Sequence, residues 1–228
     1  MSNPKQLTFP WNKSNKSNFD NFYFEGSNIE AKDALFGSGD IFLYGLEKTG
    51  KTYLLQSLCN HYFSEGKTSL FIPLKEVRDL GSQITESLES LDLICIDNVD
   101  LIAGDNSWEM AIFNLINNSL LTNCRLVFCS SLNPSNIDFV LKDLMSRIKK
   151  INHIEIFPVN TNNLPKAIKY IANSRSINLG EREIDYLIKY SERSISNLIN
   201  IIEKLDDLSM ELKRKISIPL IKEVIQVE

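Results

Sequence analysis

Apolar and polar positions follow two patterns along the first two thirds of the chain. Short, almost wholly apolar runs predict five strands, at residues 41–44, 69–74, 91–96, 125–129 and 154–157. Between them, apolar residues recur every three or four positions and predict helices over 51–63, around 108–116, and from Asn133-Pro134 to Ile148. Apolar strands separated by helices are typical of a parallel sheet covered on both faces. The pattern therefore predicts a three-layer α/β domain with a five-stranded parallel sheet.

After Pro158 the pattern becomes helical only, which predicts a small all-helical domain. At the other end, the first 18 residues are rich in Asn, Ser and Lys and have no apolar periodicity, which indicates a flexible tail. We therefore expect a tail at 1–18, an α/β domain at 19–160 and a helical domain at 161–228.

The composition is that of a globular protein without a membrane anchor. Apolar residues make up 43% of the 228 residues and charged residues 24%. No apolar stretch approaches the length of a membrane span, and the N-terminus does not resemble a signal peptide, so we expect a cytoplasmic protein. The 25 basic residues do not outnumber the 29 acidic ones, so we expect no direct sequence-specific DNA binding.

The four cysteines lie inside apolar runs, and no two of them form a CxxC pair. They are Cys59, Cys95, Cys124 and Cys129. This placement favours buried free thiols over zinc ligands or a redox pair.

One segment carries a specific phosphate-binding motif. Residues 45–52 match GxxxxGK[ST] at every fixed position and lie between a predicted strand and a predicted helix. In this motif, backbone N–H groups surround phosphate oxygens at the positive end of the helix. Lys51 would reach the outer phosphates. The residues expected to bind ADP or ATP are Gly45, Glu47, Lys48, Thr49, Gly50, Lys51, Thr52 and Tyr53.

An acidic residue follows the third predicted strand. A carboxylate at this place holds Mg²⁺ together with the hydroxyl of the phosphate loop, so Thr52 and Asp97 are the expected metal-binding residues. The next residue is Asn98, which can orient a water molecule but cannot accept its proton as a base. The chain therefore looks built to hold a nucleotide more than to hydrolyse it quickly, unless a residue such as Asp100 is the base.

Several segments resemble the DnaA-related branch of the AAA+ family of P-loop proteins. The likeness is carried by residues 93–98, by Ile102 to Asp105, by Trp108 to Phe113 and by Arg214 to Val224. Within that branch it is greatest to the short regulators that switch the replication initiator off. The resemblance covers essentially the whole chain, without the initiator's DNA-reading domain, and implies an AAA+ domain followed by a helical lid.

The resemblance also implies roles for single residues. Arg147, which by itself would be an ordinary surface residue at a helix end, corresponds to the arginine finger that points at the γ-phosphate of a neighbouring subunit. Ser130 corresponds to the residue that senses the γ-phosphate, although with Ser131 it could equally form a turn. Ser196 stands where the family has a nucleotide-contacting lid arginine, a departure for which Arg193 could substitute.

Aromatic residues near the N-terminus allow two interpretations. Phe19, Phe22 and Phe24 occupy the segment that lies beside the adenine in this family, but they could equally anchor the N-terminal arm to the core. Trp108 and Phe113 are expected in the core.

The tail contains a short peptide that resembles the motif by which many proteins bind the replication sliding clamp. Its residues are Gln6, Leu7, Thr8, Phe9 and Pro10. In such a peptide the glutamine amide enters a polar notch and the apolar side chains fill a pocket.

Together these features imply a negative regulator of replication initiation. The nucleotide-bound protein, with a sliding clamp on DNA, would stimulate hydrolysis of the ATP bound to the initiator DnaA. The expected partners are the clamp and DnaA, with a homo-oligomer possible, and the expected location is at the replisome or nucleoid. Hydrolysis of ATP by this protein itself would be weak. The alternative is a self-contained AAA+ ATPase, such as a helicase-loader-like replication factor, which the complete phosphate loop favours.

Overall fold

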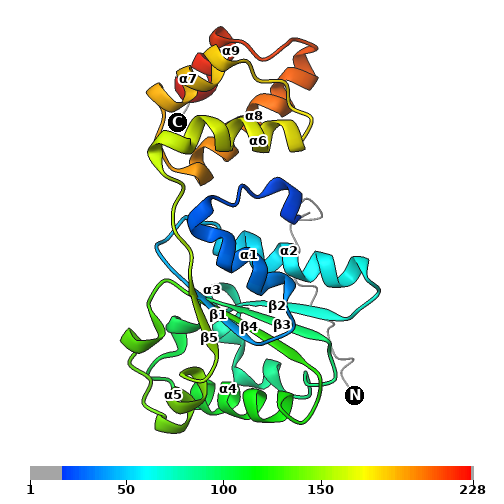
Figure 1. Ribbon diagram of the computed structural model, residues 1–228, viewed down its shortest axis with the longest axis vertical. Helices are drawn as coiled ribbons and strands as arrows, with labels where there is room; N and C mark the ends of the chain where they lie inside the picture. Colours follow the sequence, from blue (N-terminus) through cyan, green and yellow to red (C-terminus); the bar gives the residue numbers. More distant parts are fainter. Residues whose placement is uncertain (1–16, 227–228) are drawn as a thin grey trace, which may run out of the picture.

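Five short strands form one parallel sheet, as the apolar runs predict. The computed structural model describes residues 17–226 (Figure 1). The strands are β1 (Ile41–Tyr44), β2 (Ser69–Pro73), β3 (Leu93–Asp97), β4 (Arg125–Ser130) and β5 (Asn152–Glu155). They lie in the order β2-β3-β4-β1-β5, and all neighbouring strands are parallel. The carboxyl ends of the strands therefore share one edge of the sheet, where ligands bind in open α/β folds.

Helices cover both faces of the sheet, which confirms the three-layer prediction (Figure 1). Alternate strand residues point to opposite faces: fully buried Phe42 and Phe128 belong to one core, and Leu43 and Val127 to the other. The lid-facing layer holds α1 (Ile29–Phe36) and α2 (Lys51–Ser64), and the far layer holds α3 (Leu74–Val77), α4 (Asn106–Ser119) and α5 (Lys142–Ile148). Short 3-10 turns occur at Phe19–Asn21, Gly26–Asn28, Arg78–Leu80, Ser82–Thr85, Val99–Ile102, Pro134–Asn136 and Thr161–Asn163.

The C-terminal residues form a helical lobe with its own core. Its helices are α6 (Leu164–Ser174), α7 (Glu181–Tyr190), α8 (Ile195–Leu212) and α9 (Ile218–Gln226). Leu187, Leu198 and Ile221 are fully buried between them. The prediction of a helical domain is thus confirmed, and we call this lobe the lid. Within the described part of the chain, no helix combines the length and apolar character needed to cross a bilayer.

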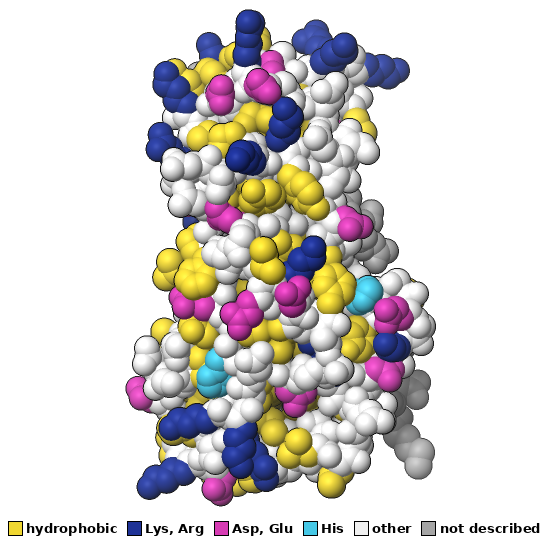
Figure 2. Space-filling view, in the orientation of Figure 1, with side chains coloured by type: hydrophobic (Ala, Val, Ile, Leu, Met, Phe, Trp, Pro, Cys, Tyr) yellow, Lys and Arg dark blue, Asp and Glu magenta, His cyan; other side chains and the backbone are white. Residues whose placement is uncertain are grey.

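Most of the basic side chains on one face lie towards the two ends of the molecule. On the face shown in Figure 2, Lys and Arg side chains gather on the lid and at the opposite end, where α5 lies, and no continuous basic strip joins them. This face therefore offers no extended track for a nucleic-acid backbone.

Two predicted boundaries were wrong. The last strand begins and ends two residues earlier than predicted, because β5 is an edge strand and tolerates the polar residues Asn152 and Glu155. The helix predicted from Asn133-Pro134 starts only at Lys142. Between the two, Ile137 and Phe139 are both buried in a non-helical segment, which helical periodicity cannot describe.

The structure also contains a helix that the sequence did not predict, α1, and an ordered segment before it. We call this segment, residues 17–28, the arm. Only Ala31 and Leu35 of α1 are buried, too few positions for a periodic signal. Ser17 and Asn18, expected in the tail, belong to the folded arm: the hydroxyl of Ser17 donates to Gln56 (3.2 Å), and its carbonyl accepts from Asn60 (2.7 Å).

Candidate nucleotide-binding site

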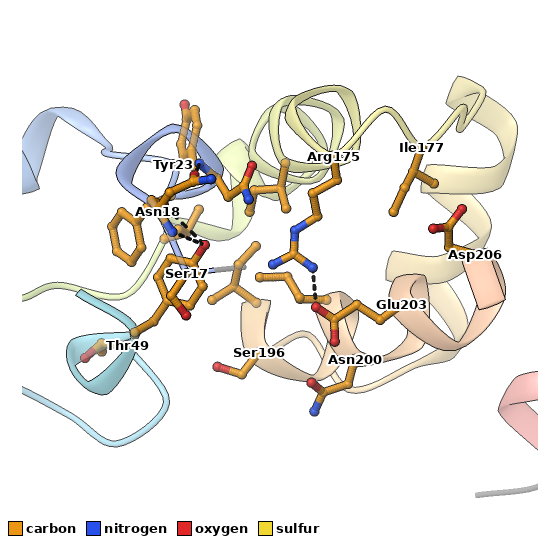
Figure 3. Close-up of a pocket in the computed structure, with 18 of the residues that line it drawn as sticks. Ser17, Asn18, Tyr23, Thr49, Arg175, Ile177, Ser196, Asn200, Glu203 and Asp206 are labelled. Carbon is orange, nitrogen blue, oxygen red and sulfur yellow. Dashed lines mark hydrogen bonds and ion pairs between the residues drawn. The ribbon is translucent and has the colours of Figure 1, made fainter. Parts of the chain in front are cut away.

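A cavity of about 870 Å³ lies between the N-terminal arm, the start of α2 and the lid (Figure 3). Tyr23 and Phe22 of the arm, Thr49 of the phosphate loop and Arg175 of the lid are among the residues that line it. Its size and its mixture of apolar walls with a few polar groups are those of a small-molecule site.

The phosphate loop has the backbone shape that its glycines permit. Gly50 has a φ of +90° and begins α2 without a side-chain cap, so the first N–H groups of the helix are available to an anion. A Cβ at Gly45 would lie 2.3 Å from the carbonyl oxygen of Ile156, and one at Gly50 would lie 2.7 Å from the ring of Phe22. Both glycines are therefore required by close packing.

Lys51 is a buried cation. Its ammonium group donates to the carbonyls of Gly45 and Leu46, each at 2.7 Å, and no ion pair joins it to a carboxylate of the described residues. Burying an unpaired charge is costly, and a bound anion would remove that cost. The position of Lys51 thus fits a phosphate group beside the loop.

Thr52 and Asp97 come together as the sequence predicts. The hydroxyl of Thr52 donates to the carboxylate of Asp97 at 2.6 Å, across the ends of α2 and β3. A hydroxyl and a carboxylate in contact are the oxygen ligands that Mg²⁺ takes in phosphate-binding sites, with waters and phosphates completing its shell. Burial raises the pKa of the neighbouring Cys129 well above its usual value, and the charge of Asp97 raises it further, so this thiol stays neutral.

The polar residues at the ends of β3 and β4 bond mainly to each other. The hydroxyl of the fully buried Ser130 accepts from the N–H of Leu132 (2.9 Å), and that of Ser131 donates to Asp100 (2.9 Å). The N–H of Asn98 donates to Asp97 (3.0 Å). Ser130 and Asp100 thus lie at the carboxyl edge of the sheet: the hydroxyl of Ser130 takes part in a turn, whereas the carboxylate of Asp100 bonds across to the loop after β4.

The lid touches the phosphate loop at one residue. Lys48, whose φ is +62°, forms an ion pair with Glu192 (3.1 Å), and its carbonyl accepts from the hydroxyl of Ser196 (3.1 Å). Ser196, which the resemblance aligns with the family's lid arginine, therefore contacts the loop itself. Arg193 is exposed and, like the exposed Glu47, is not among the residues that line the cavity.

The phenylalanine residues of the arm anchor it to the core, and one of them, Phe22, also lines the cavity. Phe19 packs on Phe36 (4.7 Å between ring centroids), and Phe24 packs on Phe22 (4.6 Å), so they anchor the arm to the core. Phe22 also lines the cavity and stacks on Tyr53, another cavity residue, at 6.1 Å.

The arm is also fixed to the linker, residues 156–163, which leads from β5 to the lid. The side-chain amide of Asn28 donates to the carbonyl of Phe157 and accepts from its N–H, both at 2.9 Å. Glu25 accepts from the N–H of Asn160 (2.8 Å) and from the side chain of Asn163. The arm and the linker to the lid are therefore joined at the wall of the cavity, which Asn28 and Phe157 both line.

Sequence reasoning missed Arg175, the residue that follows α6. Its guanidinium pairs with Glu203 of α8, and its Nε is buried without a hydrogen-bond partner among the described residues. Both residues line the cavity (Figure 3). A single arginine after a helix carries no motif, so only the folded lid identifies it.

Arg147 lies on α5, away from this cavity. The chain enters β5 five residues later, at the amino edge of the sheet, whereas the phosphate loop lies at the carboxyl edge. The guanidinium is half-buried, and no hydrogen bond or ion pair holds it within residues 17–226. Trp108 is buried and Phe113 is partly buried in the core, as expected.

Another residue missed from the sequence, Glu109, fixes the segment that leads into α5. Its fully buried carboxylate accepts from the N–H groups of Gly104 (2.7 Å), Val140 (3.1 Å) and Leu141 (2.6 Å). The clamp-like peptide at residues 6–10 lies outside the described residues.

Two family models match the chain. The model of the bacterial DnaA ATPase domain matches residues 14–154, and that of the lid domain of Hda matches residues 162–225. The boundary between these matches coincides with the linker between the two lobes.

Solved structures of DnaA share the fold. Domain III of the Thermotoga maritima initiator is 19% identical, with a TM-score of 0.75 over 92% of this chain and 95% of that one. AMPPCP-bound DnaA from Aquifex aeolicus is 23% identical (TM-score 0.69, 84% of this chain), and the match spans 65% of that structure. The RuvB branch migration motor of Thermotoga maritima is similar at 15% identity (TM-score 0.67, covering 92% and 72%).

Proposed function

The chain belongs to the family of the bacterial DnaA ATPase domain and carries a lid of the Hda type, and from this premise we propose that it is a negative regulator of replication initiation. The nucleotide-bound protein, held by a DNA-loaded sliding clamp, stimulates hydrolysis of the ATP bound to the initiator DnaA. The observation that carries this proposal is the combination of a DnaA-type ATPase domain with an Hda-type lid in one chain.

The geometry of the cavity supports stable binding of ADP or ATP with Mg²⁺. The phosphate loop offers its N–H groups and Lys51 to the phosphates, while Thr52 and Asp97 would hold the metal ion. Bound Mg²⁺ supplies charge neutralisation of the phosphates. Asn98 beside Asp97 offers no proton-accepting base, so the protein keeps its own nucleotide.

Arg147 is suited to act on a nucleotide held by another molecule. It lies at the opposite edge of the sheet from its own phosphate loop and has no partner among the described residues. A planar guanidinium supplied in trans stabilises the charge that develops on a transferred phosphoryl group, an effect worth about 10³–10⁵ in rate in other systems. Arg147 thus completes the hydrolytic site of DnaA in our proposal.

The peptide at residues 6–10 supplies the tether in this proposal. A clamp-binding peptide raises the local concentration of the protein only where clamps encircle DNA. Hydrolysis of initiator-bound ATP therefore follows the start of replication.

The test is hydrolysis of labelled ATP pre-bound to DnaA, with and without this protein and DNA-loaded clamp. We expect acceleration only when both are present. Arg147→Ala should return the rate to the unstimulated value, whereas Lys149→Ala, an exposed cation at the end of the same helix, should leave it unchanged. Replacing Gln6 and Phe9 by Ala should remove the clamp dependence together with the stimulation.

The competing function is a self-contained ATPase, which the complete phosphate loop favours. If this protein hydrolyses free ATP rapidly while DnaA-bound ATP is untouched, the regulatory proposal is wrong and this second function holds. If wild type and Arg147→Ala stimulate hydrolysis equally, the regulatory function holds but Arg147 is not the arginine finger.

A further inference from the structure

We propose that Arg175 and Glu203 of the lid read the base edge of the bound nucleotide, in place of the phosphate contact that a lid arginine at position 196 would make. This inference rests on the nucleotide-binding part of the proposed function. It starts from an ion pair, Arg175 with Glu203, that lies on the lid side of the cavity and lines it (Figure 3).

The residue aligned with the family's lid arginine, Ser196, bonds the protein's own phosphate loop. The hydroxyl of Ser196 donates to the carbonyl of Lys48 in the phosphate loop at 3.1 Å. Ser196 is uncharged and short, so it adds no cation to the phosphate end of the cavity. Arg175 is the arginine that lines the cavity.

Helix α8 sets the distance between the phosphate loop and Arg175. Ser196, Asn200 and Glu203 follow one another on the same face, four and then three residues apart, and all line the cavity. With a rise of about 1.5 Å per residue, Glu203 lies about 10 Å along the helix from the serine that touches the loop. This is comparable with the length of a nucleotide from its terminal phosphate to its base. The charged pair is therefore placed at the base end.

The surroundings of the pair suit a flat aromatic ring. Four apolar residues line the cavity on the lid: Ile171, Ile177, Ile195 and Ile199. Such walls can cover the faces of a base while its polar edge needs partners. Residues beyond the pair, Asp206 and Asp207, add negative charge and make this end unsuitable for phosphates.

The chemistry of the pair matches a base edge. The guanidinium is a planar fork of donors, of which Nη1 bonds Glu203 and the buried Nε has no partner among the described residues. A ring nitrogen or carbonyl of a base could accept from this fork, and an exocyclic amino group could donate to the carboxylate. Pairing with Glu203 leaves donors of the guanidinium unused, so a ligand that supplies an acceptor at the cavity side of Arg175 is favoured.

The experiment is calorimetric titration of the full-length protein with Mg²⁺ and either ADP or ATP, with pyrophosphate measured by competition against ADP. Arg175→Ala should raise the Kd of ADP and ATP by the same factor, about tenfold, as expected for one charged hydrogen bond. The Kd of pyrophosphate, which has no base, should not change. Arg182→Ala, an exposed lid arginine outside the cavity, is the matched control and should bind like wild type.

A second variant distinguishes a role of Arg175 in binding the base from a role in stabilising the lid. Arg175→Lys keeps a cation beside Glu203 and should preserve the melting temperature, but it loses the planar fork and should weaken ADP severalfold. If both variants bind ADP like wild type, the pair only joins α6 to α8 and the inference is wrong. A larger loss for ATP than for ADP would place Arg175 at the phosphates and also contradict it. If the wild type itself binds neither nucleotide, the proposed function fails at its first step.

Discussion

Asn98 follows Asp97, the proposed Mg²⁺ ligand, in a left-handed backbone conformation, with a φ of +59°. Asparagine is several-fold enriched there, whereas a longer acidic side chain would be strained. The backbone at the end of β3 therefore favours an amide over a glutamate. An amide can orient a water molecule but cannot take its proton. Conformation and chemistry at this residue both support the proposal of slow hydrolysis of the protein's own nucleotide.

The thiols provide a prediction at the same scale. Burial, together with the charges of Asp40, Asp92 and Glu89, raises the pKa of Cys124 to about 11. Because only the thiolate is nucleophilic, alkylation of Cys124 should rise with pH towards half its maximum near 11 in the native protein, but near 9 after unfolding. Peptide mass spectrometry after brief iodoacetamide treatment measures this, with Cys124→Ser identifying the peptide. Equal midpoints in both states would show that burial does not control this thiol.

Helix α5 is held in place by contacts from outside its own sequence. It has seven residues, begins without a side-chain cap, and follows an irregular segment. The carboxylate of Glu109 accepts from two N–H groups of that segment, those of Val140 and Leu141, and so holds it against α4. Since α5 carries Arg147, Glu109 is a positioning residue for the proposed finger.

The prediction for this element is a substitution in α4 that loosens α5. Glu109→Gln replaces one acceptor oxygen by an amino group that faces backbone donors, so the free energy of unfolding should fall by about 1–3 kcal/mol. Amide hydrogen exchange should accelerate at residues 140–144 more than elsewhere. The control is Asp143→Asn, an exposed acid-to-amide change on α5 itself. Unaltered hydrogen exchange at residues 140–144 would show that Glu109 does not hold α5 in place.

On the scale of the whole molecule, three distant segments enclose one cavity. The arm covers Gly50 with Phe22, the lid touches Lys48 through Ser196 and Glu192, and Asn28 joins arm to linker. A nucleotide bound there would contact the arm, the phosphate loop and the lid together. Its binding energy would therefore be shared across both lobes.

The corresponding prediction concerns addition and removal of ADP. At a concentration 100 times its Kd, ADP with Mg²⁺ should stabilise the protein by about 2.7 kcal/mol. Hydrogen exchange should slow most at residues 17–28, 45–52 and 195–203, and less over α4 on the opposite face. Lys51→Ala should abolish the protection. Protection confined to 45–52 would mean that arm and lid do not take part in binding.

Much of this architecture follows from local patterns in the sequence. All five strands, the phosphate loop and the separate helical lobe are predicted, because each is encoded by consecutive residues. Thr52 and Asp97 are paired correctly, because parallel strands bring such loops to one edge. The start of α5 and helix α1 are not predicted, because a buried carboxylate and two buried residues leave no periodic signal.

The sequence by itself therefore determined the class of fold and the chemistry of the phosphate end, since a contiguous motif carries both. Only the tertiary structure decided what surrounds the other end of the cavity. The pairing of Arg175 with Glu203 at that end, like the contact of Ser196 with Lys48 that seats the lid on the phosphate loop, joins residues far apart in the sequence, 28 and 148 positions respectively. Such contacts depend on how the lid sits over the arm and on how its helices pack, and no local pattern of apolar and polar residues encodes them.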